Sequence, residues 1–226
     1  MSRLPLFGLA LFTAVLVPPP ATAQDGFAGV VTYDLRANGQ SITMRYLARD
    51  GKVRQEMEMP GMPGTMFMLI GVTPGKMQVV MPSMGMYMET DMTELPGDGA
   101  PTPSGKVPVL KKLGSETIAG QACDNYLMGE EDEVMEVCVA KGLGWFMNGS
   151  MPSGPMPGAG PSTPDLSAYR SAFKDGMFPL RVTQVKGGKR EVILEATAID
   201  RKTVPEASLF VLPTGLQKMN MPGMGG

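Results

Sequence analysis

Apolar and polar residues alternate along most of this chain, and no other feature restricts its fold as strongly. In "FAGVVTYDLR", Val31, Tyr33 and Leu35 fall on one side of an extended segment, while Asp34 and Arg36 fall on the other. Successive side chains of a β-strand point to opposite faces, so a period of two is typical of a half-buried strand. The alternation returns between turns that contain Gly or Pro, in residues 41–49, 52–59, 65–72, 76–82, 84–90, 107–113, 123–138, 178–188 and 190–201.

These segments add up to about ten or eleven strands, and one further segment has helical spacing. In "STPDLSAYRSAFKDG", Leu166, Tyr169 and Phe173 recur on one helical face, Pro164 suits the first turn, and Gly176 follows the last. A single layer of sheet cannot bury its own apolar face, so it must curl or face a second sheet, and the lone helix favours curling. We expect a mainly β fold: a curled antiparallel sheet, forming an incomplete barrel, with one short amphipathic helix.

The N-terminus has the pattern of an export signal. Behind Arg3 lies the apolar run "LPLFGLALFTAVLV", which is too short to span a membrane and ends near the cleavage-site pattern Ala21-Thr22-Ala23. We expect a Sec-type signal peptide over residues 1–23, cleavage near Ala23/Gln24, no transmembrane anchor, and a periplasmic or secreted mature protein. Residues 24–226 are expected to form a single β-rich domain. It has flexible Pro/Gly-rich loops near 95–106 and 148–164 and a Met/Gly-rich C-terminal tail.

Two cysteines in an exported chain predict one disulfide. In "CDNYLMGEEDEVMEVC", two strand-like arms flank an acidic turn. A hairpin centred between Glu130 and Glu131 places Cys123 opposite Cys138, and Tyr126 opposite Met135. We therefore expect a Cys123–Cys138 disulfide that closes this hairpin.

The composition argues against several classes of function. The chain has no histidine, which removes the commonest general base and the commonest transition-metal ligand. Its 20 basic residues are outnumbered by 22 acidic ones, which argues against a nucleic acid partner. The acidic turn at 129–133 lacks the ligand spacing of a calcium loop. We expect no enzyme activity, no catalytic residues and no cofactor.

Several segments together resemble a known family: "GVVTYDL", "GQSITMRYLARDGKVRQEM", "GSETIAGQACDNYLM", "VAKGLGWF", "FPLRV" and the ending "LFVLPTGLQKMNMPGM". In this order they are similar to the family of domain of unknown function 4412, and they cover nearly all of the mature chain. That family in turn resembles periplasmic lipoprotein carriers of the LolA/LolB type, whose fold is an incomplete antiparallel barrel with helices over an apolar cavity. The resemblance implies an exported protein and brings no catalytic residues. The chain departs from the LolA pattern in having one clear helix instead of several.

Methionines two residues apart recur in the predicted strands. Residues i, i+2 and i+4 of a strand share a face, so segments such as "MEM", "MFM" and "MGMYM" each present a row of thioethers. Ordinary core packing is one explanation, but core strands favour stiffer side chains such as Val and Ile. The other explanation is a soft groove that binds a lipid, an acyl chain or a lipoprotein, with the helix as its lid. The ligand-binding candidates are Met57, Met59, Met66, Met68, Met84, Met86, Met88, Leu166, Tyr169 and Phe173.

Metal handling is the alternative function. Thioethers are soft ligands that select Cu(I), and two methionines spaced two apart can place both sulfurs on one ion. Because the methionines of the strands are expected inside, the candidates are those of the tail "MNMPGMGG": Met219, Met221 and Met224.

Overall fold

The computed structural model describes residues 27–37, 39–61, 63–91, 109–130, 133–146, 169, 172–173 and 176–219. The predicted signal peptide and the two predicted flexible loops lie outside these ranges. Two short 3-10 helices occur within them, η1 (Pro82–Met84) and η4 (Ala207–Phe210). The strands are β1 (Gly29–Ala37), β2 (Gln40–Arg49), β3 (Lys52–Met57), β4 (Met66–Ile70), β5 (Lys76–Met81), β6 (Met86–Asp91), β7 (Val109–Ile118), β8 (Gln121–Glu130), β9 (Glu133–Ala140), β10 (Phe178–Lys186), β11 (Lys189–Asp200) and β12 (Gln217–Met219).

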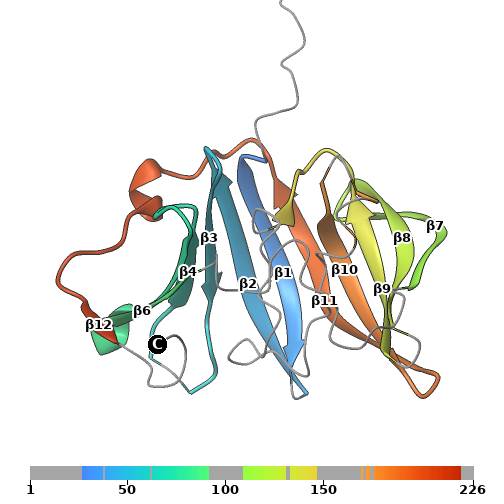
Figure 1. Cartoon of the computed structure of the whole chain (residues 1–226), viewed down its shortest axis with the longest axis horizontal. Helices are drawn as coiled ribbons and strands as arrows, with labels where there is room; N and C mark the ends of the chain where they lie inside the picture. The colour runs from blue at the N-terminus through green and yellow to red at the C-terminus, as the bar shows by residue number, and fades with distance from the viewer. Residues whose placement is uncertain are drawn as a thin grey trace, which may run out of the picture.

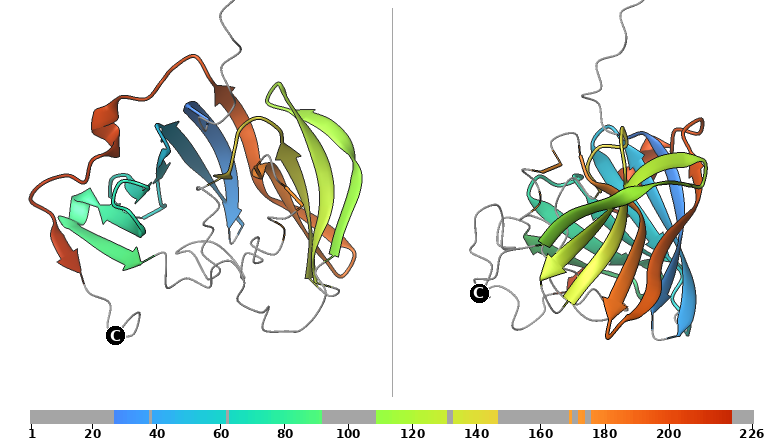
Figure 2. Two further views of the ribbon diagram at one scale, coloured as in Figure 1. Left: turned by 45° about the horizontal axis from the view of Figure 1, so that its top comes forward. Right: turned by 90° about the vertical axis from the view of Figure 1, so that its right-hand side faces the viewer.

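All twelve strands belong to one sheet, in the order β12-β6-β5-β4-β3-β2-β1-β11-β10-β9-β8-β7. Neighbours are antiparallel except β12, which pairs in parallel with β6. Figure 1 shows β6 and β12 at one end of the sheet and β7 at the other. In Figure 2 the sheet curves into an arch whose ends do not meet. The predicted class, a mainly β fold with a curled, incomplete antiparallel barrel, is confirmed. None of the helices in the described ranges has the length and apolar character needed to cross a membrane.

Tight turns join the strands of β1–β3, as the sequence predicts. Between β2 and β3 the turn consists of Asp50 and Gly51, with φ values of 50° and 70°. Two successive positive φ values belong to the type I′ turn, whose twist matches that of the flanking strands. The sequence Asp-Gly favours this turn because both residues tolerate the left-handed region.

The register of β2–β6 assigns alternate residues to two faces. Tyr46 lies opposite Gln55, Gln55 opposite Met68, Met68 opposite Val79, and Val79 opposite Met88. Because directly opposite residues point the same way, all five side chains share one face. We call this the inner face.

The opposite face of β4–β6 is covered by the C-terminal part of the chain. There Phe67, Leu69 and Val80 are buried and form a cluster with Leu212 and Leu216. We call residues 205–216 the strap. In Figure 2 the strap, drawn in orange-red, runs along the outside of the arch before it reaches β12. The face under the strap is therefore the outer face, and the inner face lines the inside of the arch.

Two arginines of the outer face hold the strap through its backbone. Arg49 Nη1 donates to the Pro205 carbonyl oxygen at 2.9 Å, and Arg54 Nη1 donates to that of Leu209 at 3.0 Å. The Arg54 guanidinium also stacks 3.5 Å above the Phe67 ring centroid. These bonds satisfy carbonyl groups of a segment that has no strand partner at these positions.

The predicted disulfide is present, but the hairpin around it differs in register. Cys123 and Cys138 are bonded, with 5.5 Å between their Cα atoms. Cys123 lies opposite Ala140 and Cys138 opposite Asn125, so the two cysteines are diagonal neighbours. The prediction that they lie directly opposite each other was wrong by two residues. A shift of two keeps both sulfurs on the same face, which is why the disulfide still forms.

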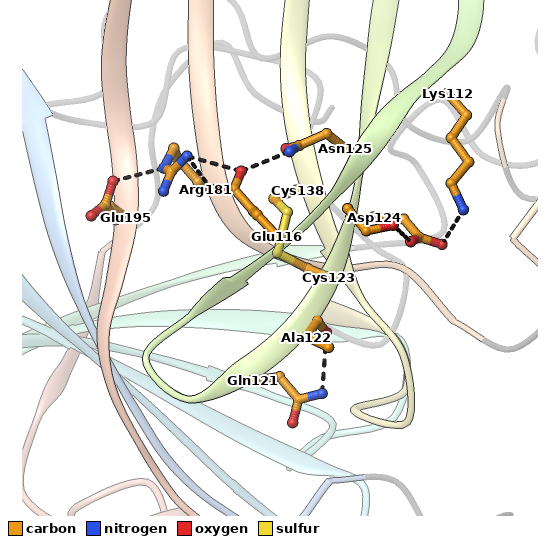
Figure 3. Close-up of a disulfide and its surroundings, with 11 residues drawn as sticks. Lys112, Glu116, Gln121, Ala122, Cys123, Asp124, Asn125, Cys138, Arg181 and Glu195 are labelled. Atoms are coloured by element: carbon orange, nitrogen blue, oxygen red, sulfur yellow. Dashed lines mark hydrogen bonds and ion pairs between the residues drawn. A yellow bond between two sulfur atoms is a disulfide. The ribbon is translucent and has the colours of Figure 1, made fainter.

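Charged residues surround this disulfide, as Figure 3 shows. Arg181 bonds to Glu116 at 2.9 Å and to Glu195 at 2.8 Å, and thereby joins three strands. On the other side Asp124 Oδ2 lies 2.8 Å from Lys112 Nζ. Hydrogen bonds from Lys112 and Ser115, and the charge of Lys112, hold the pKa of the Asp124 carboxyl well below its usual range.

Candidate functional site: a methionine-lined inner face

Strands β2–β6 and β12 all place methionine on the inner face. Met44 lies opposite Met57, which lies opposite Met66, so three thioethers cross three neighbouring strands in line. Towards the end of the sheet Met81 lies opposite Met86. The complete set on this face is Met44, Met57, Met66, Met68, Met77, Met81, Met86, Met88 and Met219.

Exposure increases along this face from the centre of the sheet to its end. Met57 and Met68 are each only 5% exposed. Met86 and Met88 on β6 are half-buried, and Met219 on β12 is 43% exposed. The face is therefore part of the core near β3 and β4 and becomes accessible to solvent near β6 and β12.

One candidate of the methionine row lies elsewhere. Met84 belongs to η1 in the connection between β5 and β6 and is 53% exposed, so it does not line up with Met86 and Met88 as predicted. Pro82 begins this short helix, and Gly85, with a φ of 66°, ends it in the left-handed region. The strand consequently starts at Met86. Met59, just beyond β3, is half-buried and packs against the inner-face cluster.

The predicted lid residues Tyr169 and Phe173 do not join the methionines of β2–β6. Tyr169 and Phe173 are buried in a separate cluster against β8–β10, together with Met128 and Val137. The amides of residues 172 and 173 both donate to the Tyr169 carbonyl oxygen, which makes a single turn. Leu166, like Met221 and Met224 of the tail, lies outside the described residues.

Aromatic residues that the sequence analysis did not select close the inner face near β1 and β2. Tyr46 stacks on Phe146 with 4.8 Å between ring centroids, and Phe178 packs edge-on against both. Buried beside them, Tyr33 donates its hydroxyl to the Pro179 carbonyl oxygen at 2.9 Å, and burial raises the pKa of that phenol. A period-two pattern marks Tyr33 and Tyr46 as inward-facing, but Phe146 follows a strand and carries no such signal.

The outer face of β5 and β6 carries charge where the inner face carries thioether. Glu89 Oε1 lies 2.7 Å from Lys76 Nζ and 2.9 Å from Lys218 Nζ. Hydrogen bonds from Lys76, Lys218 and Gln78 lower the pKa of Glu89 to about 2. The glutamate thus remains ionised and connects β5, β6 and β12, as expected for the wet side of a strand.

The described residues contain no cluster of three or more His, Cys, Asp or Glu that could hold a metal ion. Both cysteines are used in the disulfide. The chemistry offered by the inner face is therefore that of apolar, polarizable sulfur.

Solved structures with a similar fold include an uncharacterized conserved protein from Thermus thermophilus. It has a TM-score of 0.52 and 15% identity, and the match covers 86% of this chain and 90% of that one. A chain of the MucA/MucB complex of Pseudomonas aeruginosa has a TM-score of 0.48 and 14% identity over 88% of this chain and 59% of its own length. A putative outer membrane lipoprotein-sorting protein domain from Vibrio parahaemolyticus has a TM-score of 0.33 and 10% identity over 81% of this chain and 89% of that one. At these identities the likeness concerns the fold alone.

A comparison with curated protein sequences finds no match. The profile of the family described as domain of unknown function (DUF4412) matches residues 27–216, which span β1 to the end of the strap. The resemblance drawn from the sequence segments is thereby confirmed: the chain belongs to the DUF4412 family.

Proposed function

We propose that this chain is an exported, non-catalytic protein that binds a hydrophobic ligand on its methionine-lined inner face. The ligand class is a lipid, an acyl chain or a lipidated protein. The observation that carries the proposal is the difference between the two faces of β4. Met66 and Met68 point inward, while Phe67 and Leu69 point outward, and all four are buried.

Burial alone does not explain this difference. If the inner face were only core, its amino-acid composition would follow the same strand preferences as that of the outer face of the same strands. The outer residues pack against the strap, a fixed partner supplied by the chain itself. Methionine is unbranched and adapts its shape, so it lowers packing specificity and suits a partner of variable shape. The outer face therefore carries residues suited to one fixed partner, the strap, and the inner face carries methionines suited to a partner of variable shape.

The size of the apolar interaction is sufficient for binding. Each buried methylene contributes about 0.8 kcal/mol, so an acyl chain of a dozen carbons gains on the order of 10 kcal/mol. Lost translational and rotational freedom offsets part of this gain. The remainder is compatible with micromolar or tighter binding.

The test compares two neighbouring residues of β6 that point to opposite faces. Met88 faces inward and Tyr87 outward, and both are half-buried. The mature protein is purified from an exporting host and examined by native mass spectrometry, before and after delipidation. We expect an adduct of lipid mass that Met88→Gln weakens strongly and Tyr87→Gln leaves in place. A wild-type protein that carries no adduct and takes up no added fatty alcohol would refute the proposal.

Cu(I) binding is a second candidate, because the register brings half-buried and exposed thioethers together at the end of the sheet. Met81 lies opposite Met86, and Met88 lies opposite Met219, all on one face. Directly opposite side chains have Cβ atoms about 5 Å apart, which allows several sulfurs to reach one ion. Met219 thus remains a candidate from the tail and is joined by Met81, Met86 and Met88, while Met221 and Met224 lie outside the described residues.

A competition titration separates the two functions. Cu(I) is titrated in ascorbate against a chromophoric chelator, with Met88→Leu and Met219→Leu as variants. Leucine keeps the apolar surface and removes the sulfur, so it should abolish Cu(I) binding and preserve lipid binding. Micromolar or weaker affinity of the wild type for Cu(I) would dismiss this candidate.

A further inference from the structure

One polar side chain lies in the middle of the inner face. Gln55, at the centre of β3, is 3% exposed. It lies directly opposite Tyr46 on one side and Met68 on the other, with Val53 and Met57 two residues away on its own strand. All four neighbours are buried. An amide at this position interrupts an otherwise apolar and aromatic surface.

The hydrogen bonds of this amide are incomplete. Gln55 Nε2 donates to the Met44 sulfur, while Gln55 Oε1 is buried and has no hydrogen-bond partner among the residues that the structure describes. A thioether accepts hydrogen bonds but has no hydrogen to donate, so the amide end at Met44 must be the NH2 group. The oxygen is consequently the end without a partner. Such a group destabilises a fold, and a methionine of similar size would remove the penalty.

The described strands β2–β6 place no charged side chain on the inner face beside Gln55. In the described strands β2–β6, every Lys, Arg, Asp and Glu whose side chain the register places on a face points outward, including Arg54, Glu56 and Glu89. An ionised carboxylate beside Gln55 Oε1 would bring two acceptors together without a cation. It would also lose its hydration without compensation. The head group that fits is neutral and carries a hydrogen-bond donor.

We infer that Gln55 is a specificity-determining residue. It is buried in the free protein, and when an apolar ligand displaces the flexible methionine side chains around it, Oε1 accepts a hydrogen bond from a neutral head group, a hydroxyl or an amide N–H. This inference rests on the proposed function and names the ligand class: fatty alcohols, acylglycerols or fatty amides in preference to ionised fatty acids. A few well-placed polar groups on an apolar lining are the usual source of selectivity in such sites.

The protein contains its own control for this inference. Gln78 is also 3% exposed, and its Oε1 is also buried without a hydrogen-bond partner in the described part of the chain. It lies on the outer face, where its Nε2 donates to Thr73 and Glu89 at 3.2 Å. Replacing either glutamine by methionine removes one buried amide, but only Gln55→Met changes the inner face.

The experiment uses two probes with the same alkyl chain, dodecanol and its methyl ether, in which a methyl group replaces the hydroxyl hydrogen and removes the donor. Binding to the delipidated full mature chain is measured by titration calorimetry, with thermal unfolding of each free protein. We expect the wild type to bind the alcohol about tenfold more tightly than the ether. Gln55→Met should make the two affinities equal while it raises the melting temperature, and Gln78→Met should preserve the tenfold preference. Dodecanoate at pH 8 should bind more weakly than the alcohol.

Two different results would overturn the inference. If both probes bind the wild type but Gln55→Met leaves their affinity ratio unchanged, Gln55 does not select the head group and the proposed function survives. If neither probe binds the wild type, the proposed function fails and this inference fails with it.

Discussion

The hydroxyl of Tyr169 joins the main chains of β7 and β8, and its removal tests how the turn at residues 169–173 is held. The Gly129 amide donates to Tyr169 Oη at 2.7 Å. Tyr169 Oη in turn lies within donating distance of two carbonyl oxygens, that of Val109 at 3.1 Å and that of Gly129 at 3.3 Å. Val109 and Gly129 are register partners, so the hydroxyl bridges the end of this strand pair.

Tyr169→Phe keeps the ring and removes the bridge. Gly129 is buried, so its amide would lose its acceptor away from water. An unsatisfied buried donor costs about 1–3 kcal/mol. For a domain of this size, 1 kcal/mol lowers the melting temperature by about 2–4 °C, so a middle value of about 2 kcal/mol predicts a fall of about 4–8 °C. If Gly129 exchanges by local opening, the same energy accelerates its amide exchange about thirtyfold.

The assay is thermal unfolding combined with hydrogen exchange of Gly129, with Tyr126→Phe as the matched control. Tyr126 packs edge-on against Phe173 in the same cluster, with 4.9 Å between ring centroids. Its hydroxyl forms no hydrogen bond with the described residues, and we expect its loss to cost less than about 0.5 kcal/mol. Equal melting temperatures for the two variants would refute the reasoning, because the hydroxyl would then contribute nothing to holding this turn.

Three further predictions concern the disulfide, pH and oxidation. Reduction of the Cys123–Cys138 bond, which closes a loop of 15 residues, should lower the free energy of unfolding in urea by about 3 kcal/mol. Glu89 has a pKa of about 2 in the folded chain against an ordinary 4.5. Its contribution is therefore present above pH 4.5 and lost as the pH falls towards 2, and Glu89→Gln should flatten this part of the stability curve. Under mild peroxide, peptide mapping should find Met84, 53% exposed, oxidised well before Met68, 5% exposed.

Side-chain alternation predicted much of the candidate site, because it fixes the face of every residue in a strand once one residue is placed. Met66 with Met68, and Met86 with Met88, share a face as expected. The alternation fails at Met84, where the chain leaves the strand for a short helix. Pro82 and Gly85, which flank Met84, were the sequence signal for a turn at this point. Their effect on the backbone was stronger than the strand-like spacing of the methionines.

The local sequence pattern could not predict which strands pair over long distances in the chain, or in which register. The observed register of the Cys123–Cys138 hairpin differs from the predicted one by two residues. A shift of two residues leaves every side chain on the same face, so the alternation of apolar and polar residues cannot distinguish the two registers. The parallel strand β12 is only three residues long and pairs with a strand more than a hundred residues earlier in the chain. Its position depends on Leu212 and Leu216, which fix the strap on the outer face. No periodicity in a three-residue segment could show this.

The two edges of the inner face are closed with very different strength, which predicts where the ligand of the proposed function would enter. Near β1 the ladder with β2 runs over nine residue pairs and is covered by packed aromatic rings. At the far end β12 is held by three residue pairs, by a hydrogen bond that the Gln217 backbone N–H donates to the Gly85 carbonyl oxygen at 2.8 Å, and by the ion pair of Lys218 with Glu89. Local opening requires least free energy where few contacts are lost. Detachment of β12 would move Met219 away from Met88 while the strap stays on the outer face, so the methionine-lined face opens first at its most exposed end.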